Sequence, residues 1–453
     1  MDENFLLSTK TGQRLYHQYA RDLPIIDYHN HLSLQELSAD QNYPDLAALW
    51  LTSDPYKHRA MRICGVNEQY ITGGASHEEK FAAWMDTLPR LAGNPLYDWS
   101  VLEMQRVFDI CLEPGITDVH WLWQQTGKML TDPDFKPTAL LRRFGVEYAS
   151  PCAQITDDLT PFAAQPFLSP SLRGDTIVAC APDTCDALEQ LTGIHIHSLQ
   201  NYIDAVCART AAFATAGCRF ADHALDNGFR YCPEDGKNEA RFAFLRQGGA
   251  LTIGEKQHLE SAILRLLAQE YATRGWAMQL HIGAQRTTSS RLRALAGPAG
   301  GFAGIGGGCD VHSLTSMLND FEQTVSGMPR IILYTLNPAD NAVMAVLSGS
   351  YSQDGVAGKV QQGPAWWWCD HLYGMRQVFE SISAYGVLSV SIGMTTDSRS
   401  VLSMVRHEYF RRALCGWMGE KAERGELPNR EALLGEIVTN VCYRNAKRVV
   451  EYG

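Results

Sequence analysis

Short apolar runs alternate with longer amphipathic segments over most of this 453-residue chain. The runs are rich in β-branched residues and have the length of buried strands, whereas the segments between them repeat apolar residues at helical spacing. Such alternation is typical of parallel βα units. The runs that we interpret as strands are residues 24–26, 144–149, 176–180, 218–222, 278–282, 331–335 and 387–394, with 365–368 as a candidate eighth.

Seven or eight such units predict an α/β fold, a distorted (β/α)8 barrel of the TIM type, with its chemistry at the carboxyl ends of the strands. A doubly wound open sheet is the alternative. No Gly-x-Gly-x-x-Gly motif follows a strand and opens a helix, which weakens the dinucleotide-binding version of that fold. The glycine-rich stretch 297–308 follows a polar segment, so we expect a flexible loop there.

Helical segments flank and interrupt this pattern. We predict helices at residues 9–21, 198–216, 255–275, 401–424 and 429–452. The long stretch after the first strand is helical throughout, with leucine and aromatic anchors and breaks at glycine and proline. We therefore assign residues 1–34 and 140–453 to the barrel and residues 35–139 to a helical insertion.

The composition is that of an ordinary globular enzyme, with 45% hydrophobic and 20% charged residues. A net charge of -11 without a basic run argues against nucleic acid or an anionic membrane as the main partner. The twelve cysteines include no Cys-x-x-Cys pair, which predicts neither a zinc ribbon nor a disulfide framework. There is no signal-like N-terminus and no apolar run long enough to span a bilayer, so we expect a cytoplasmic protein.

A short motif at the end of the first expected strand carries the most specific candidate chemistry. His29 and His31 flank one residue just after the apolar run 24–26. Because side chains along a strand alternate between its faces, both imidazoles project to the same side. Two converging imidazoles favour a divalent-metal site, and a core histidine beside a loop histidine is the plain structural alternative. His195 and His197 repeat the spacing without a strand or an acidic partner.

Asp397 is the acidic partner for this histidine pair, since it follows the last expected strand, 387–394. If that strand closes the barrel against the first, Asp397 lies beside His29 and His31. Two histidines and one carboxylate with open positions are a common ligand set for a divalent ion. An isolated aspartate here is more often a helix cap, but the strand-end histidines favour a ligand.

Further polar residues fall at the ends of other expected strands. Each one alone is more often structural, but several at the same ends of parallel strands are what a barrel active site requires. They are Asp222 with His223, His281, and Asn337 with Asp340.

Taken together, these motifs resemble the uronate isomerase (glucuronate isomerase) family of the amidohydrolase superfamily. The similarity runs in the family's order from about residue 4 to the C-terminus. It rests on residues 27–32, 54–62, 222–226, 281–284, 336–338, 358–359, 366–367 and 396–400.

The resemblance implies a distorted (β/α)8 barrel and a metal-assisted aldose–ketose isomerisation of a hexuronate, D-glucuronate to D-fructuronate or D-galacturonate to D-tagaturonate. Such a reaction needs a base, a group that stabilises the enediolate oxygens and a cation for the distal carboxylate. The family's motifs place the metal on His29, His31 and Asp397, catalysis on Tyr56, Asp397 and His281, and substrate binding on Arg399, Trp366 and His281.

The resemblance also implies one divalent ion, with zinc as the default and manganese or iron satisfying the same ligands. The expected partner is a small sugar acid, and we expect a homo-oligomer that binds neither nucleic acid nor membrane.

The chain departs from the family at several positions. Ala181 stands where members usually carry a substrate-binding arginine after the expected strand 176–180, and a serine-proline-cysteine segment, 150–152, replaces a usual Thr-Thr-Asp-Asp-Pro. Losing a buried carboxylate-binding arginine should cost on the order of 2–5 kcal/mol. We therefore predict a diverged pocket wall, for which Arg173 or Arg286 could compensate.

Two other classes of function stay open on this sequence. One is a hydrolase, for example a lactonase, that uses the same metal to activate water. The other is a non-catalytic sugar-acid-binding paralogue, against which the retained Tyr56 and Asp397 argue mildly.

Overall fold

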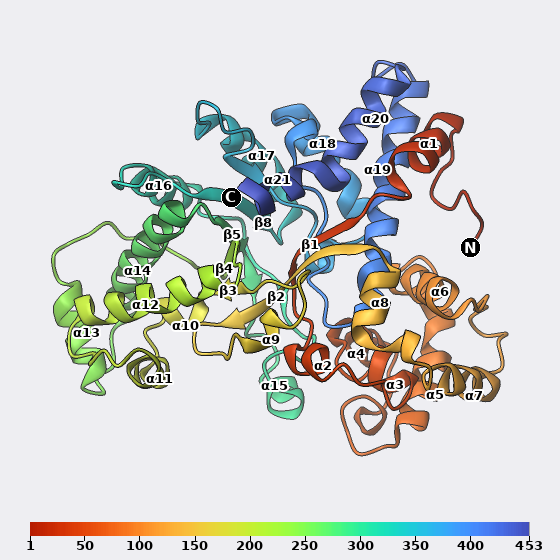
Figure 1. The fold of residues 1–453 in the computed structure, drawn as a ribbon, viewed down its shortest axis with the longest axis horizontal. Helices are drawn as coiled ribbons and strands as arrows, with labels where there is room; N and C mark the ends of the chain where they lie inside the picture. The colour runs from red at the N-terminus through yellow and green to blue at the C-terminus, as the bar shows by residue number, and fades with distance from the viewer. Residues whose placement is uncertain (453) are drawn as a thin grey trace.

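A curled sheet of seven parallel strands forms the centre of the molecule (Figure 1). The computed structural model describes residues 1–452. The spatial order of the strands is β1-β2-β3-β4-β5-β8-β9. Their bounds are β1 Ile25–Asn30, β2 Val146–Gln154, β3 Ser171–Arg173, β4 Phe220–Leu225, β5 Ala277–Ile282, β8 Arg330–Thr335 and β9 Val360–Gln362. A separate two-stranded ribbon pairs β6, Ala284–Gln285, with β7, Gly304–Ile305.

An extended segment, residues 391–398, takes the place of an eighth strand beside β1. The backbone amide of Asp397 donates to the carbonyl of His29 at 3.0 Å, and the amide of His31 donates to the carbonyl of Ser398 at 2.8 Å. On its other side the amide of Ile392 donates to the side chain of Gln361 in β9 at 2.7 Å. The expected (β/α)8 barrel is confirmed, and it is distorted because this last position forms no regular ladder.

Three strand predictions need correction. Residues 176–180 are apolar and β-branched but lie in and after a single helical turn, α10 (Asp175–Val178), and the third strand is β3 instead. Residues 388–390 of the expected strand 387–394 form a 3-10 turn, Leu388–Val390. Residues 365–368 lead into another 3-10 turn, Trp367–Cys369, whereas the seventh strand is β9, whose two glutamines hide its character.

Helices alone fill the chain between β1 and β2, as the sequence predicts, and they lie together at the lower right of Figure 1. Many begin at a side-chain cap, such as Ser76 with Glu79 in a reciprocal capping box on α5. The α-helices are α2 Leu34–Ala39, α3 Leu46–Trp50, α4 Pro55–Ile63, α5 His77–Thr87, α6 Pro95–Phe108, α7 Val119–Met129 and α8 Pro137–Arg143.

The other helices surround the sheet, and they include helices close to the five predicted at residues 9–21, 198–216, 255–275, 401–424 and 429–452. The N-terminal helix is α1, Lys10–Leu15, continued by a π-turn, and the C-terminal helices are α19 Val405–Glu423, α20 Glu431–Thr439 and α21 Asn445–Tyr452. Those between strands are α9 Thr160–Ala163, α11 Pro182–Thr192, α12 Leu199–Thr215, α13 Asn238–Arg246, α14 Ile253–Arg274, α15 Ser290–Ala296, α16 Val311–Glu322, α17 Asn341–Ser350 and α18 Leu372–Tyr385. Within residues 1–452, no helix is long and apolar enough to cross a membrane.

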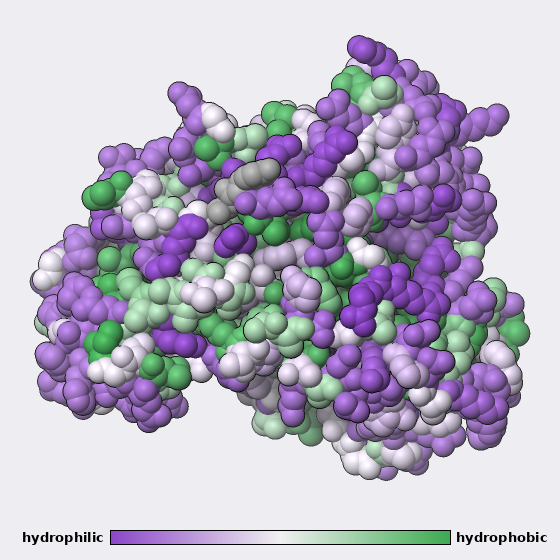
Figure 2. Space-filling model, viewed as in Figure 1, coloured by the Kyte–Doolittle hydropathy of each residue, from purple (hydrophilic) through white to green (hydrophobic). Residues whose placement is uncertain are grey.

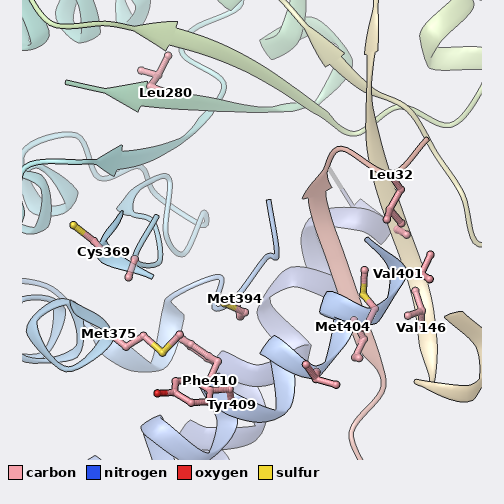
Figure 3. Close-up of a cluster of buried hydrophobic side chains, with 14 of the residues drawn as sticks. Leu32, Val146, Leu280, Cys369, Met375, Met394, Val401, Met404, Tyr409 and Phe410 are labelled. Carbon is pink, nitrogen blue, oxygen red and sulfur yellow. The ribbon is translucent and has the colours of Figure 1, made fainter. Parts of the chain in front are cut away.

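The hydrophobic core supports the segment that closes the barrel. Figure 3 shows Met394, Val401 and Met404 between the first two strands and the C-terminal helices, and each is buried. Tyr409 and Phe410 of α19 extend this cluster toward α18. The visible face of the molecule is largely polar, with smaller apolar groups between (Figure 2). Packing on both sides therefore fixes an extended backbone that has few ladder hydrogen bonds of its own.

Candidate active site and metal centre

β1 brings His29 and His31 to one side of the strand's carboxyl end, as the alternation predicts. Their imidazole centroids are 5.3 Å apart. Asp397 lies against both, with Oδ1 at 3.3 Å from His29 Nε2 and 3.0 Å from His31 Nε2. The structure therefore brings together the three side chains that the sequence suggested as metal ligands.

Asp397 is held in place by several bonds. Its φ of +48° lies in the left-handed region, a conformation that a non-glycine residue keeps only when its surroundings fix it. Its Oδ2 accepts a hydrogen bond from Trp366 Nε1 at 2.9 Å. One residue earlier, the amide of Thr396 donates to the buried carboxylate of Asp27 at 2.7 Å. Asp27 thus ties β1 to the closing segment.

The three groups shift one another's protonation. Burial alone would lower the pKa of His31, but Cys152 and Asp397 raise it to about 9. Burial would raise the pKa of Asp397, yet its bonds to His29 and His31 hold it well below the usual range. Without an ion, the ionised carboxylate therefore favours protonated imidazoles, and a divalent cation that binds here would displace those protons and take their place beside Asp397.

Three more strand ends add donor atoms around His29. Cys152 lies near the end of β2, Asp222 lies in β4 and His281 in β5. Nitrogen, sulfur and oxygen atoms of His29, His31 and Cys152 lie within 4.8 Å of one another, as do those of His29, Asp222 and His281. Sequence reasoning missed Cys152, because a single cysteine at a strand end has no signature of its own.

His281 stays neutral in this environment. Burial and the neighbouring His29 lower the pKa of His281 to about 3. Its ring stacks on Tyr334 at 4.6 Å and lies 4.7 Å from Trp366, and within residues 1–452 its buried Nε2 has no hydrogen-bond partner. Buried polar atoms normally have a hydrogen-bond partner, so this nitrogen is available to bind a ligand.

These observations test whether a divalent ion fits. Two imidazole nitrogens converge on one carboxylate oxygen, and further nitrogen, sulfur and oxygen donors surround them. Such a mixed set suits zinc, and its N and O members also suit manganese or iron. The residues present fit a divalent ion.

A cavity of about 460 Å³ opens beside the three ligand-type residues. Its lining comprises His31, Asp54, Pro55, Tyr56, Cys152, Gln154, Asp157, Arg173, Arg286, Arg293, Pro298, Ala299, Gly301, Ala303, Trp367, Trp368, Asp397, Ser398, Arg399 and Ser400. The volume suits a small ligand such as a six-carbon acid.

Tyr56 enters this cavity from the first turn of α4. Asp54 caps that helix by accepting from the amides of Tyr56 and Lys57 at 2.9 and 3.2 Å. Burial and Asp397 raise the pKa of Tyr56 well above its usual value, although the guanidinium of Arg406, 5.2 Å from the ring centre, opposes them. Among the described residues, the Tyr56 hydroxyl has no hydrogen-bond partner, so it faces the cavity protonated and free.

Four arginines line the cavity, Arg173, Arg286, Arg293 and Arg399, and Arg286 is paired with Asp226 at 2.8 Å. Arg399 follows the closing segment and, in the part of the chain that the structure describes, makes no ion pair. Arg173, at the end of β3, lies 3.0 Å from Asp175 and 3.6 Å from Asp222. Arg399 is therefore free to meet an anion directly.

The expectation of a lost arginine at Ala181 is wrong in its placement. Ala181 precedes α11 and does not line the cavity, because residues 176–180 before it are not the third strand. The true third strand ends on Arg173, which does line the cavity. An arginine at the end of β3 is thus present, and no diverged wall follows from Ala181.

The glycine-rich loop after α15 roofs the cavity and docks on α4. Arg59 Nη1 donates to the carbonyl of Gly301 at 3.2 Å, and Arg62 donates to that of Gly300. Gly301 has φ +81°, and a Cβ atom there would lie 2.2 Å from the carbonyl oxygen of Pro55. The expected flexible loop is therefore seated against the helix that carries Tyr56.

Replacing Gly301 by alanine is expected to weaken the contact between this loop and α4. The left-handed backbone costs alanine about 1 kcal/mol, and the clash with Pro55 adds to it. Limited chymotrypsin digestion should cut the loop after Phe302 faster, and substrate should bind more weakly. Gly297→Ala is the matched control, because its φ is +72° but no atom lies within 4 Å of the new Cβ. Equal digestion of the two variants would contradict the docking.

Several residues singled out in the sequence lie elsewhere. His223 points away from the barrel axis, and its Nε2 lies 3.2 Å from the hydroxyl of Tyr271 in α14. Asn337 caps a 3-10 turn, and Asp340 accepts from the amide of Cys309 at 2.8 Å. The exposed pair His195 and His197 lies in the loop before α12, consistent with its role as a comparison for the first pair.

Comparisons with known proteins agree with this geometry. The family described as glucuronate isomerase matches residues 1–450. The uronate isomerases of Marinomonas sp. (strain MWYL1) and Geobacillus thermodenitrificans (strain NG80-2) are each 39% identical, covering 99% of this chain and 98% of theirs. The crystal structure of uronate isomerase from Thermotoga maritima is 27% identical with a TM-score of 0.92, covering 99% of both chains. That of glucuronate isomerase from Caulobacter crescentus, 22% identical with a TM-score of 0.90, covers 100% of this chain and 97% of its own and shares the fold.

Proposed function

Because the chain belongs to the glucuronate isomerase family, we propose that it interconverts an aldose hexuronate and its ketose at the cavity beside His29, His31 and Asp397. The substrate class is D-glucuronate, D-galacturonate or both. The observation that carries the proposal is the convergence of both histidine nitrogens on Asp397 next to a free tyrosine hydroxyl and an unpaired arginine.

We propose that His29, His31 and Asp397 hold one divalent ion, with zinc first in preference. When bound, the ion would polarise the C1 and C2 oxygens of the sugar and acidify the C2 hydrogen. Trp366 and Thr396 keep the carboxylate and its backbone in place. His281 does not line the cavity, but its neutral imidazole lies 4.8 Å from the ring of His29.

The isomerisation moves two protons, and the chain offers a group for each. One proton leaves C2 and returns to C1, and we assign it to Asp397, which lines the cavity and is ionised at neutral pH. The other passes from the C2 hydroxyl to the C1 oxygen. Tyr56, neutral and unpartnered, can donate its own proton to O1 and accept the one from O2.

Arg399 is the proposed partner of the distal carboxylate, since a guanidinium fork matches a carboxylate and this one makes no ion pair within residues 1–452. Changing Arg399 to methionine should therefore cost about 2–5 kcal/mol of substrate binding, a factor of roughly 30 to several thousand in kcat/KM. Steady-state kinetics with D-glucuronate measures this. The control is Arg291→Met, an exposed residue of α15 outside the cavity lining.

Wild type and the Arg399→Met variant should also differ in selectivity. Wild type should prefer D-glucuronate strongly over D-glucose, which lacks the carboxylate, and the Arg399 variant should lose most of that preference. An Arg399 variant with unchanged selectivity would assign the carboxylate to another cation, with Arg173, Arg286 and Arg293 the remaining candidates in the lining.

A proton NMR time course in D2O tests the function itself. Zinc-loaded protein with D-glucuronate or D-galacturonate should form the ketose and exchange the C2 hydrogen for deuterium. Folded, metal-loaded protein that leaves both sugars unchanged would sink the proposal. Hydrolysis of a sugar-acid lactone in the same tube would point to the hydrolase, and ligand-induced thermal stabilisation without turnover would point to a binding protein.

We further propose a cytoplasmic, homo-oligomeric enzyme. None of the twelve cysteines forms a disulfide, and the buried Cys180 and Cys185 are both free thiols. Free thiols suit a reducing compartment.

A further inference from the structure

The thiol of Cys152 contacts the ring nitrogen of His29 that does not face Asp397. Its Sγ is 3.6 Å from His29 Nδ1, whereas His29 Nε2 faces Asp397 Oδ1 at 3.3 Å. The two ring nitrogens of one imidazole thus have different partners. The sulfur also lies 3.4 Å from Asp222 Oδ1, to which the thiol donates.

Asp222 is itself anchored. Its Oδ2 lies 3.6 Å from Arg173 Nη1, and only 2% of its surface is exposed. Burial would raise the pKa of Asp222, but Arg173 and the nearby histidines lower it to about 2. The carboxylate is therefore a permanent acceptor behind the sulfur, and a row of contacts runs from Arg173 through Asp222 and Cys152 to His29.

We infer that Cys152 is a positioning residue, which fixes the ring of His29 so that Nε2 is presented to the divalent ion. The sulfur accepts a hydrogen bond from His29 Nδ1–H, and its own S–H donates a hydrogen bond to Asp222 Oδ1. Metal-binding histidines usually donate their second ring nitrogen to a fixed acceptor, which sets tautomer and ring direction. Here a thiol backed by a carboxylate fills that role. The inference rests on the proposed metal site.

Direct ligation by the sulfur is the competing interpretation, because atoms of His29, His31 and Cys152 lie within 4.8 Å of one another. The contact from sulfur to Nδ1 favours positioning, since an imidazole that binds an ion through Nε2 presents Nδ1 to its surroundings. The two interpretations predict different spectra for cobalt, which replaces zinc in such sites. A sulfur ligand gives an intense near-ultraviolet charge-transfer band, and a positioning sulfur gives none.

The experiment measures zinc affinity by chelator competition in wild type, Cys152→Ala and Cys152→Ser. The alanine variant should bind zinc about 10- to 100-fold more weakly. Serine, which can donate and accept in the same place, should recover most of that affinity. Cys207→Ala on α12 is the matched control, because it is also half-buried but does not line the cavity. Cobalt-loaded wild type should lack the sulfur charge-transfer band.

Each other outcome overturns the inference. Unchanged zinc affinity in Cys152→Ala, or a serine variant as weak as alanine, would show that the thiol does not position His29. A sulfur-to-cobalt band would make Cys152 a ligand instead. Wild type that binds zinc and isomerises hexuronate would keep the proposed function in either case, whereas wild type without metal affinity would overturn both. If the alanine variant does not fold, Cys152→Val provides the same comparison.

Discussion

Replacing Asp397 by asparagine should abolish metal binding and lower kcat/KM on the order of a thousandfold, several kcal/mol of lost stabilisation. Asparagine has nearly the same shape and can still accept from Trp366 Nε1. It lacks the negative charge that lies 3.0 and 3.3 Å from the two histidine nitrogens. Metal analysis of the purified variant and the NMR time course measure the two losses.

The matched control removes the charge of a carboxylate that lies outside the cavity. Asp340→Asn removes the charge of an aspartate that follows β8 and accepts from the Cys309 amide. Asp340 does not line the cavity, so metal content and activity should match wild type. An Asp397→Asn enzyme with one tightly bound ion would contradict the ligand assignment.

Replacing Tyr56 by phenylalanine should lower kcat by about 10²- to 10⁴-fold with little change in KM. The hydroxyl makes no hydrogen bond among the described residues, so its removal leaves the packing of the ring against Trp368 intact. Folding and zinc content should therefore stay at wild-type levels. The loss is confined to the relay of the hydroxyl proton from O2 to O1.

Deuterium exchange tells this role from that of the carbon base. If Tyr56 serves only the oxygens, the phenylalanine variant still exchanges the C2 hydrogen in D2O while ketose accumulates slowly. Loss of both exchange and product in parallel would assign the C2 proton to Tyr56 as well. Tyr43→Phe, whose hydroxyl meets Glu36 outside the cavity, is the control.

The sequence predicted the strands whose burial in the structure also produces their apolar pattern in the sequence. β1, β5 and β8 are buried along their lengths, and their apolar runs show it. β9 is short and contains two glutamines, which face Asn341 and the amide of Ile392 through hydrogen bonds. Tertiary partners there outweigh local pattern, so the sequence did not predict β9, and it predicted the closing segment near residues 387–394 but not its irregular form.

The candidate site divides in the same way. His29, His31 and Asp397 follow from strand alternation and from barrel closure, which sequence order supplies. Cys152 and the true position of Arg173 depend on where β2 and β3 end, and the boundaries of elements are the least certain part of any such prediction. Because the third strand was predicted at residues 176–180, the position of the arginine after it was wrongly assigned to Ala181.

The distance along the chain between Asp27 and Thr396, 369 residues, has a consequence for biosynthesis. At about 5–20 residues per second, a ribosome needs on the order of 20–70 s to add the second after the first. During that interval the nascent chain displays His29 and His31 on an edge strand with no carboxylate beside them. Such edges invite pairing with other chains. The proposed metal site therefore stays incomplete until Asp397 has been synthesised, and chaperone protection would matter most for the N-terminal strand of the barrel.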